Sequence, residues 1–211
     1  MNRKSRELRL NPGDALIVVD LQNDFLPGGA LAVRHSSEII PVINRYIALF
    51  QSKGLPVYAT RDWHPKDHCS FETHGGPWPP HCIQDTPGSR FPSELRLPAS
   101  VVVISKAAER EKDAYSGFEG TDLAERLRAA ETRRLLIGGL ATEYCVFNTV
   151  KDALRNGFSV LLLLDAVRAV NVNPDDGKKA VQEMIRLGAQ PVEFADIQKA
   201  ESGGESTLRG R

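Results

Sequence analysis

Short apolar runs alternate with helical patterns along most of this 211-residue chain. The runs typical of strands cover residues 15–19, 55–59, 101–104, 134–137, 160–164 and 192–194. Apolar residues at helical spacing, bounded by capping and glycine signals, cover 36–53, 121–131, 142–155 and 173–188. Strands that alternate with helices form parallel sheets covered on both faces. The pattern therefore predicts a three-layer α/β/α fold with a central, mainly parallel six-stranded sheet of Rossmann-like topology.

Length and charge limit the classes of protein that fit. The length suits one domain, which we place at residues 1–198, and residues 199–211 are predicted to be a disordered tail. The 27 basic and 27 acidic residues give zero net charge, which argues against a nucleic acid or membrane partner and permits a homo-oligomer. An N-terminus without an apolar signal core, and three cysteines without a CxxC pair, indicate a cytoplasmic protein with reduced thiols.

One connection breaks the regular alternation. Residues 61–100 form an irregular stretch rich in proline and glycine, which contains four of the five histidines and both tryptophans. Long irregular connections inside compact domains are usually functional when they are not disordered. We therefore expect this stretch to contribute to the functional site.

Ionisable residues follow four successive predicted strands: Asp20, then Asp62 and His64, then Lys106, then Cys145. Ligands bind outside the carboxyl ends of the strands in open parallel sheets, so these side chains are expected to meet. Cys145 falls in the first turn of a predicted helix, where a thiol ionises more easily and free N–H groups can hold an oxyanion. Lys106 can stabilise the thiolate, and Asp20 can orient either group and carry a proton.

A second constellation has the composition of a metal site. Asp62 and His64 are two residues apart on an extended segment, so their side chains point the same way. A third ligand within the long connection could be His68, His74 or His81. Two imidazoles and one carboxylate suit zinc or iron, and also manganese.

Taken together, these residues match a known family. The chain resembles the nicotinamidase/pyrazinamidase branch of the isochorismatase-like cysteine hydrolases. The matching segments are 18–25 (VVDLQNDF), 60–65 (TRDWHP), 78–82 (WPPHC), 115–118 (YSGF) and 139–146 (GLATEYCV). The set of aspartate, lysine and cysteine is typical of the superfamily, whereas DxH with the later PxHC is typical of this branch.

The resemblance implies a mechanism. Cys145 would attack the amide carbonyl of nicotinamide and form a thioester, with Asp20 as proton carrier and Lys106 as the balancing charge. The backbone N–H groups of Ala141 and Cys145 would form the oxyanion hole, and the Leu140–Ala141 peptide would be cis. The metal ligands it implies are one carboxylate and two imidazoles, namely Asp62, His64 and His81. Phe25 and Trp78 would form aromatic walls around the substrate ring, with Tyr115 near the mouth.

The function expected from the resemblance is hydrolysis of nicotinamide to nicotinate and ammonia, extended to pyrazinamide. The main alternative is another small amide, carbamoyl or ureido substrate in the same superfamily. A non-haem iron oxygenase built on the metal ligands would leave Cys145 and Lys106 without a role, and a thiol sensor would leave the metal ligands without one. The roles of His68, Ser70, Glu72 and the charged segment 107–114 stay open.

Overall fold

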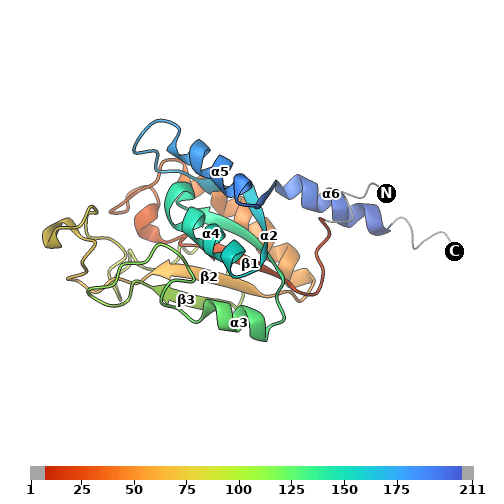
Figure 1. Ribbon diagram of the computed structural model, residues 1–211, viewed down its shortest axis with the longest axis horizontal. Coiled ribbons are helices and arrows are strands. Elements are labelled where there is room, and N and C mark those ends of the chain that lie inside the picture. The colour runs from red at the N-terminus through yellow and green to blue at the C-terminus, as the bar shows by residue number, and fades with distance from the viewer. Residues whose placement is uncertain (1–7, 206–211) are drawn as a thin grey trace.

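Six parallel strands form one sheet within residues 8–205, the part of the chain that the computed structural model describes (Figure 1). The strands are β1 (Asp14–Val19), β2 (Val57–Asp62), β3 (Val102–Lys106), β4 (Arg134–Leu140), β5 (Ser159–Arg168) and β6 (Gln190–Val192). Their order is β3-β2-β1-β4-β5-β6, and every pairing between neighbours is parallel. The predicted sheet is confirmed.

Helices cover both faces of this sheet (Figure 1). On one face lie α2 (Ile39–Ser52) and α6 (Phe194–Glu205), and on the other lie α3 (Leu123–Ala129), α4 (Phe147–Arg155) and α5 (Asp176–Arg186). Shorter helical turns are η1 (Asn23–Phe25), η2 (Ser36–Glu38), η3 (Glu72–His74) and η4 (Thr142–Val146). Alternate residues of β1 contribute to the two cores, as a strand buried on both faces must. The three predicted layers are therefore present.

The central strands extend beyond the apolar runs that predicted them. β2 and β3 stay paired up to Asp62, which is in register with Lys106. β4 continues through Gly138 and Gly139, where a turn was expected. A polar or glycine residue ends an apolar run in the sequence, but the ladder of backbone hydrogen bonds does not depend on side-chain polarity. Asp62 and Lys106 are thus held on rigid strand ends.

The C-terminal prediction of disorder is wrong for residues 199–205, because α6 continues through them. Ile197 and Ala200 of this helix are buried against the core. Glu201 accepts a hydrogen bond from the Leu10 backbone N–H at 2.7 Å and pairs with Lys53 at 2.6 Å. The helix forms because apolar residues at positions 194, 197 and 200 share one face. Residues 206–211, the rest of the predicted tail, lie outside the described residues.

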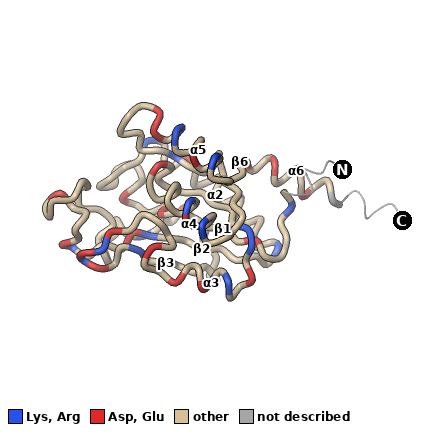
Figure 2. The backbone as a smooth tube through the Cα atoms, viewed as in Figure 1, with Lys and Arg blue, Asp and Glu red and all other residues tan. Residues whose placement is uncertain are grey.

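The long connection between β2 and β3 is ordered and lies beyond the strand ends, beside the segment that follows β3 (Figure 1). Isolated bridges join His64 to Ile83 and Phe71 to Trp78, and the Phe71 side chain is fully buried. Acidic and basic residues are interspersed along the chain (Figure 2). No described helix combines the length and the apolar character needed to cross a membrane.

Gly139 allows the close approach of β4 to β1. Its φ is +131°, and a Cβ there would lie 2.0 Å from the Val19 carbonyl oxygen. We expect Gly139→Ala to lower the free energy of unfolding by about 3 kcal/mol or more, because it adds both backbone strain and overlap. Urea denaturation measures this. The control is Gly203→Ala in α6, where nothing lies within 4 Å of the added Cβ and a change of at most about 1 kcal/mol is expected. Equal midpoints for the two variants would contradict the prediction.

Candidate active site

The Lys106 ammonium lies at the centre of the converging strand ends. Its Nζ donates a hydrogen bond to Asp62 Oδ1 and another to the Ala114 carbonyl at 3.1 Å. The same atom lies 3.0 Å from Asp20 Oδ2 and 3.4 Å from Cys145 Sγ. Burial alone would lower the pKa of Lys106, but the charges of Asp20 and Asp62 outweigh it and raise this pKa well above its usual value. Lys106 is therefore a permanent cation in contact with three other site residues.

Asp20 follows β1 and is completely buried beside the thiol. Thr60 Oγ1 donates to its Oδ1 at 2.6 Å, and Oδ2 forms an ion pair with Lys106 Nζ at 3.0 Å. A carboxylate oxygen of Asp20 lies within 4.8 Å of Cys145 Sγ. Burial raises the pKa of Asp20, and the Lys106 charge opposes this. A buried carboxylate next to a thiol, with its pKa raised by burial, is suited to receive the thiol proton.

Cys145 lies in η4, a π-turn that leads directly into α4. The turn begins after the Leu140–Ala141 peptide, which is cis as expected. The Ala141 carbonyl accepts hydrogen bonds from the backbone N–H groups of Tyr144 and Val146, both at 3.1 Å. This arrangement places the thiol at the carboxyl edge of the sheet, as the sequence predicts.

The ionisation of the thiol differs from the expectation. Burial raises the pKa of Cys145 well above its usual value; Lys106 lowers it, while Asp20 and Asp62 raise it further. The sequence argument considered the helix terminus and Lys106 but not the burial and the two carboxylates. Cys145 is consequently a protonated thiol at neutral pH, which makes a nearby proton acceptor necessary for nucleophilic attack.

Asp62, His64 and His81 form a buried group whose potential ligand atoms all lie within 4.8 Å of one another. Nδ1 of His64 lies 3.3 Å from the Ala107 carbonyl, and Nδ1 of His81 lies 2.8 Å from the Pro79 carbonyl. Such contacts hold a metal-binding imidazole in the tautomer that leaves Nε2 for the ion. Burial lowers the pKa of His64 to about 4, so this ring is neutral, as a ligand must be. The group fits a divalent metal ion.

The structure separates the other candidate ligands from this group. His74 is exposed in η3, and Glu72 is exposed in the same turn. His68 is buried with its ring centroid 4.2 Å from that of His64, but its own nitrogens contact Ser70 and the Lys112 carbonyl. A second group of close ligand atoms, Asp20, Asp62 and Cys145, surrounds the Lys106 ammonium and so is not suited to a metal cation.

A narrow pocket joins the thiol to the metal group. Residues from both halves of the site line it, together with aromatic and aliphatic walls: Phe25, Leu31, Val33, Asp62, Trp78, His81, Tyr115, Ala141, Tyr144, Cys145 and Val170. Trp78 Nε1 donates a hydrogen bond to the Tyr115 hydroxyl at 2.9 Å. The Tyr144 ring lies edge-on to Trp78, with centroids 5.1 Å apart. The pocket thus has the aromatic and aliphatic lining that suits a small flat ring.

Comparison with known proteins decides the family. The Isochorismatase domain model matches residues 14–196. The chain belongs to the isochorismatase family. A nicotinamidase of Escherichia coli (strain K12) is 38% identical in an alignment that covers 90% of this chain and 99% of that protein.

Solved structures agree with this assignment. The pyrazinamidase of Pyrococcus horikoshii in complex with zinc is 54% identical, with a TM-score of 0.84 over 87% of this chain and all of that one. A protein of L. infantum in complex with nicotinate is 37% identical, with a TM-score of 0.80 over 88% of this chain and 94% of that one. The expected resemblance to the nicotinamidase/pyrazinamidase branch is confirmed.

Sequence reasoning missed a glutamine that holds a candidate ligand of this isochorismatase-family site. Gln22 is fully buried; its Oε1 accepts from the Asp62 backbone N–H at 2.8 Å, and its Nε2 donates to the Asp62 carbonyl at 2.8 Å. The side chain thereby continues the pairing of β2 beyond the end of β1. Its place in the motif at 18–25 was the available signal, but the partner lies 40 residues away.

Two further residues were also missed, one in the pocket wall and one that supports the wall from outside the pocket. Tyr144 immediately precedes Cys145 and forms part of the aromatic wall. Glu143 accepts hydrogen bonds from the backbone N–H groups of Val170 and Asn171, at 3.2 and 2.6 Å, and so holds Val170 on the pocket wall. Both lie in the motif that carries the thiol, which was the only signal for them in the sequence.

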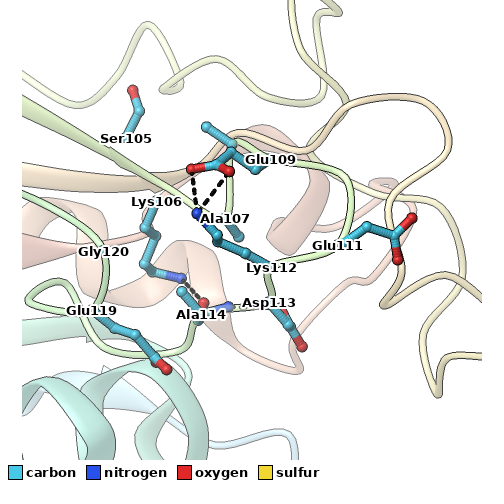
Figure 3. A pocket seen from close by; sticks show the side chains of 11 residues that line it. Ser105, Lys106, Ala107, Glu109, Glu111, Lys112, Asp113, Ala114, Glu119 and Gly120 are labelled. Atoms are coloured by element: carbon cyan, nitrogen blue, oxygen red, sulfur yellow. Dashed lines mark hydrogen bonds and ion pairs between the residues drawn. The ribbon is translucent and has the colours of Figure 1, made fainter.

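A second cleft of about 440 Å³, larger than the narrow pocket, is lined by Lys106 (Figure 3). Charged side chains of segment 107–114 border it, and Glu111 and Asp113 point away from Lys106. Neither the thiol nor the metal group lines it. Although this cleft is larger than the narrow pocket, it is therefore not the active site of this isochorismatase-family chain.

Lys106 should lower the pKa of Cys145, so its removal should raise that pKa. Lys106→Met keeps the bulk of the side chain and leaves the Asp20 and Asp62 carboxylates uncompensated next to the thiol. We expect alkylation of Cys145 by iodoacetamide to need higher pH in this variant than in the parent. The pH profile of alkylation, with Cys145→Ala as the blank for the other cysteines, checks it. An unmoved profile would show that the two groups are not electrostatically coupled.

Proposed function

We propose that this protein hydrolyses nicotinamide to nicotinate and ammonia through a thioester on Cys145. The observation that carries the proposal is the pocket itself, in which a buried thiol and the group of Asp62 and His81 face the same narrow aromatic space. A thiol sensor would not need the metal group, and an oxygenase would not need the thiol. The similarity to a nicotinamidase and to a nicotinate complex supports this substrate.

The pocket walls suit the pyridine ring. Phe25 and Trp78 would contact its faces, and Tyr115, which is fixed by its hydrogen bond from Trp78, would close the mouth. A divalent ion held by Asp62, His64 and His81 would supply a Lewis-acidic site for the ring nitrogen. We propose zinc, as in the Pyrococcus complex, or iron, with manganese compatible with the same ligands. Pyrazinamide, with a similar flat ring, should fit the same pocket.

The chemistry then follows from the groups around the thiol. Asp20 accepts the thiol proton as Cys145 Sγ attacks the amide carbon, and the backbone N–H groups of Ala141 and Cys145 stabilise the oxyanion. Asp20 next gives the proton to the departing nitrogen, so that ammonia leaves and the thioester remains. Water attacks the thioester carbonyl carbon as Asp20 accepts its proton. The C–S bond then breaks, Asp20 returns the proton to the leaving thiolate, and the carboxylic acid product is released and ionises to nicotinate. Lys106 keeps the charge of this centre balanced throughout.

Ammonia release from nicotinamide tests the proposal directly. We expect turnover by the parent, loss of turnover after treatment with a chelator, and recovery when a divalent metal is returned. Cys145→Ala should reduce turnover by at least about 1,000-fold, since loss of a covalent nucleophile removes the reaction path. The variant should still bind metal, because the thiol and the metal group come from different loops. Activity of Cys145→Ala within about tenfold of the parent would contradict the nucleophilic role.

His81→Ala should weaken metal retention and raise KM more than it alters the reactivity of the thiol. The reason is that His81 belongs to the group that would orient the ring, whereas Lys106 and Asp20 act on the thiol. Elemental analysis gives the metal content, nicotinamide kinetics give KM, and alkylation of Cys145 gives the thiol reactivity. A fully loaded His81→Ala protein would show that His81 is not a metal ligand.

A further inference from the structure

Segment 107–114 turns its side chains to solvent and its backbone toward the site. The five charged residues Glu109 to Asp113 are exposed, and Lys112 pairs with Glu109 at 2.8 Å (Figure 3). Ala107 and Ala114, at the two ends, are buried. The exposed charged side chains are therefore not what brings this segment into contact with the site.

Five carbonyl groups of this segment accept hydrogen bonds from the surrounding site. The donor–acceptor pairs are His64 Nδ1 with Ala107 at 3.3 Å, Gln84 Nε2 with Ala108 at 3.1 Å, Cys69 N with Arg110 at 2.9 Å, His68 Nε2 with Lys112 at 3.1 Å, and Lys106 Nζ with Ala114 at 3.1 Å. The segment thus contacts a proposed metal ligand at one end and the central lysine at the other.

His68 holds the middle of the segment. Its Nδ1 accepts a hydrogen bond from the Ser70 backbone N–H at 3.3 Å and lies 2.7 Å from Ser70 Oγ. Because Nδ1 is an acceptor, the proton of the neutral ring is on Nε2 and is donated to the Lys112 carbonyl. The ring has no exposed surface. Both nitrogens are therefore engaged within the protein, and neither is available to an ion.

Besides His64 and His68, two other side chains of the long connection contact the segment, and both contacts are exposed. Gln84 Nε2 donates to the Ala108 carbonyl at 3.1 Å. Arg110 pairs with Asp67 at 3.1 Å, but both side chains are more than half exposed. Exposed ion pairs contribute little to stability, whereas a satisfied buried hydrogen bond holds its partners in one geometry. The buried imidazole is thus the side chain best placed to fix the segment.

We propose that His68 is a positioning residue that holds segment 107–114 through its hydrogen bond to the Lys112 carbonyl. The Ala107 carbonyl of the held segment then fixes His64 Nδ1, and the Ala114 carbonyl fixes Lys106 Nζ. The proposal rests on the proposed function for the roles of His64 and Lys106. Hydrogen-bond partners of a metal ligand fix the tautomer and the orientation of its ring. His68 acts on the metal group through this segment and not by coordination.

Two substitutions separate positioning from coordination. His68→Gln keeps an N–H donor for the Lys112 carbonyl but replaces the imidazole, and His68→Leu removes the donor while filling a similar volume. The matched control is His74→Leu, at an exposed histidine of the same connection. Zn²⁺ affinity is measured by competition with a chelator. Local opening of the segment is measured by the backbone hydrogen exchange of the peptide that covers 107–114.

In the His68→Leu variant we expect the backbone amides of segment 107–114 to exchange their hydrogens faster than in the parent. We also expect Zn²⁺ to bind about tenfold or more weakly, which is the usual effect of losing a hydrogen-bond partner of a metal ligand. His68→Gln should match the parent in both measurements, as should His74→Leu. Loss of Zn²⁺ affinity in both His68 variants with unchanged exchange would make His68 a ligand and overturn the proposal. Unchanged affinity and exchange in a folded His68→Leu protein would overturn it as well.

The test remains decisive if His68→Leu does not fold. His68→Gln alone then supports the proposal when its Zn²⁺ affinity and exchange are those of the parent, and overturns it when Zn²⁺ affinity is lost. Both measurements are made without nicotinamide. A parent protein that released no ammonia from nicotinamide would therefore contradict the proposed function and leave the result for His68 intact.

Discussion

One buried ammonium group holds the site together. Lys106 Nζ is in contact with Asp20, Asp62 and Cys145, and all four side chains are buried. Two carboxylates without a cation would repel each other in a medium that solvates them poorly, so removing the lysine leaves uncompensated charge. Asp62 also belongs to the metal group, and its charge therefore enters both metal binding and the ionisation of the thiol. The two halves of the site are electrostatically one unit.

The sheet explains why these groups can meet. The strand order reverses at the neighbours β1 and β4, so the chain leaves the sheet in opposite directions at this point and opens a crevice at the carboxyl edge. Asp62 and Lys106 end two paired strands in register, which places their side chains on the same side of the sheet. Gly139 brings β4 close to β1, and η4 then carries Cys145 back over the strand ends. The chemistry depends on backbone pairing that no single segment defines.

This dependence sets the limit of prediction from the sequence. Apolar runs located the first five strands, and ionisable residues just after them located Asp20, Lys106 and Cys145 at one edge. The sixth strand, predicted at 192–194, lies at Gln190–Val192, and α6 begins at Phe194. The raised pKa of Cys145 was not predictable, because it comes from burial and from the carboxylates of Asp20 and Asp62, which are far from Cys145 in the sequence. Gln22 was missed, and the role of His68 stayed open, for a related reason: their partners, Asp62 and the Lys112 carbonyl, lie 40 and 44 residues away. α6 was not predicted because its apolar face is short and the segment contains several glycines and charged residues.

The arrangement also separates recognition from bond breaking. Trp78 and His81 belong to the long connection after β2, so the aromatic wall and a proposed metal ligand move with the same backbone. Asp20, Lys106 and Cys145 belong to the sheet edge, where strand pairing fixes them. Tyr144 joins the two parts, because it stands next to the nucleophile and packs edge-on to Trp78. A shift of the connection would therefore reach the thiol by two routes: through the contact of Trp78 with Tyr144, and through the hydrogen bond of His68 to segment 107–114, which contacts Lys106.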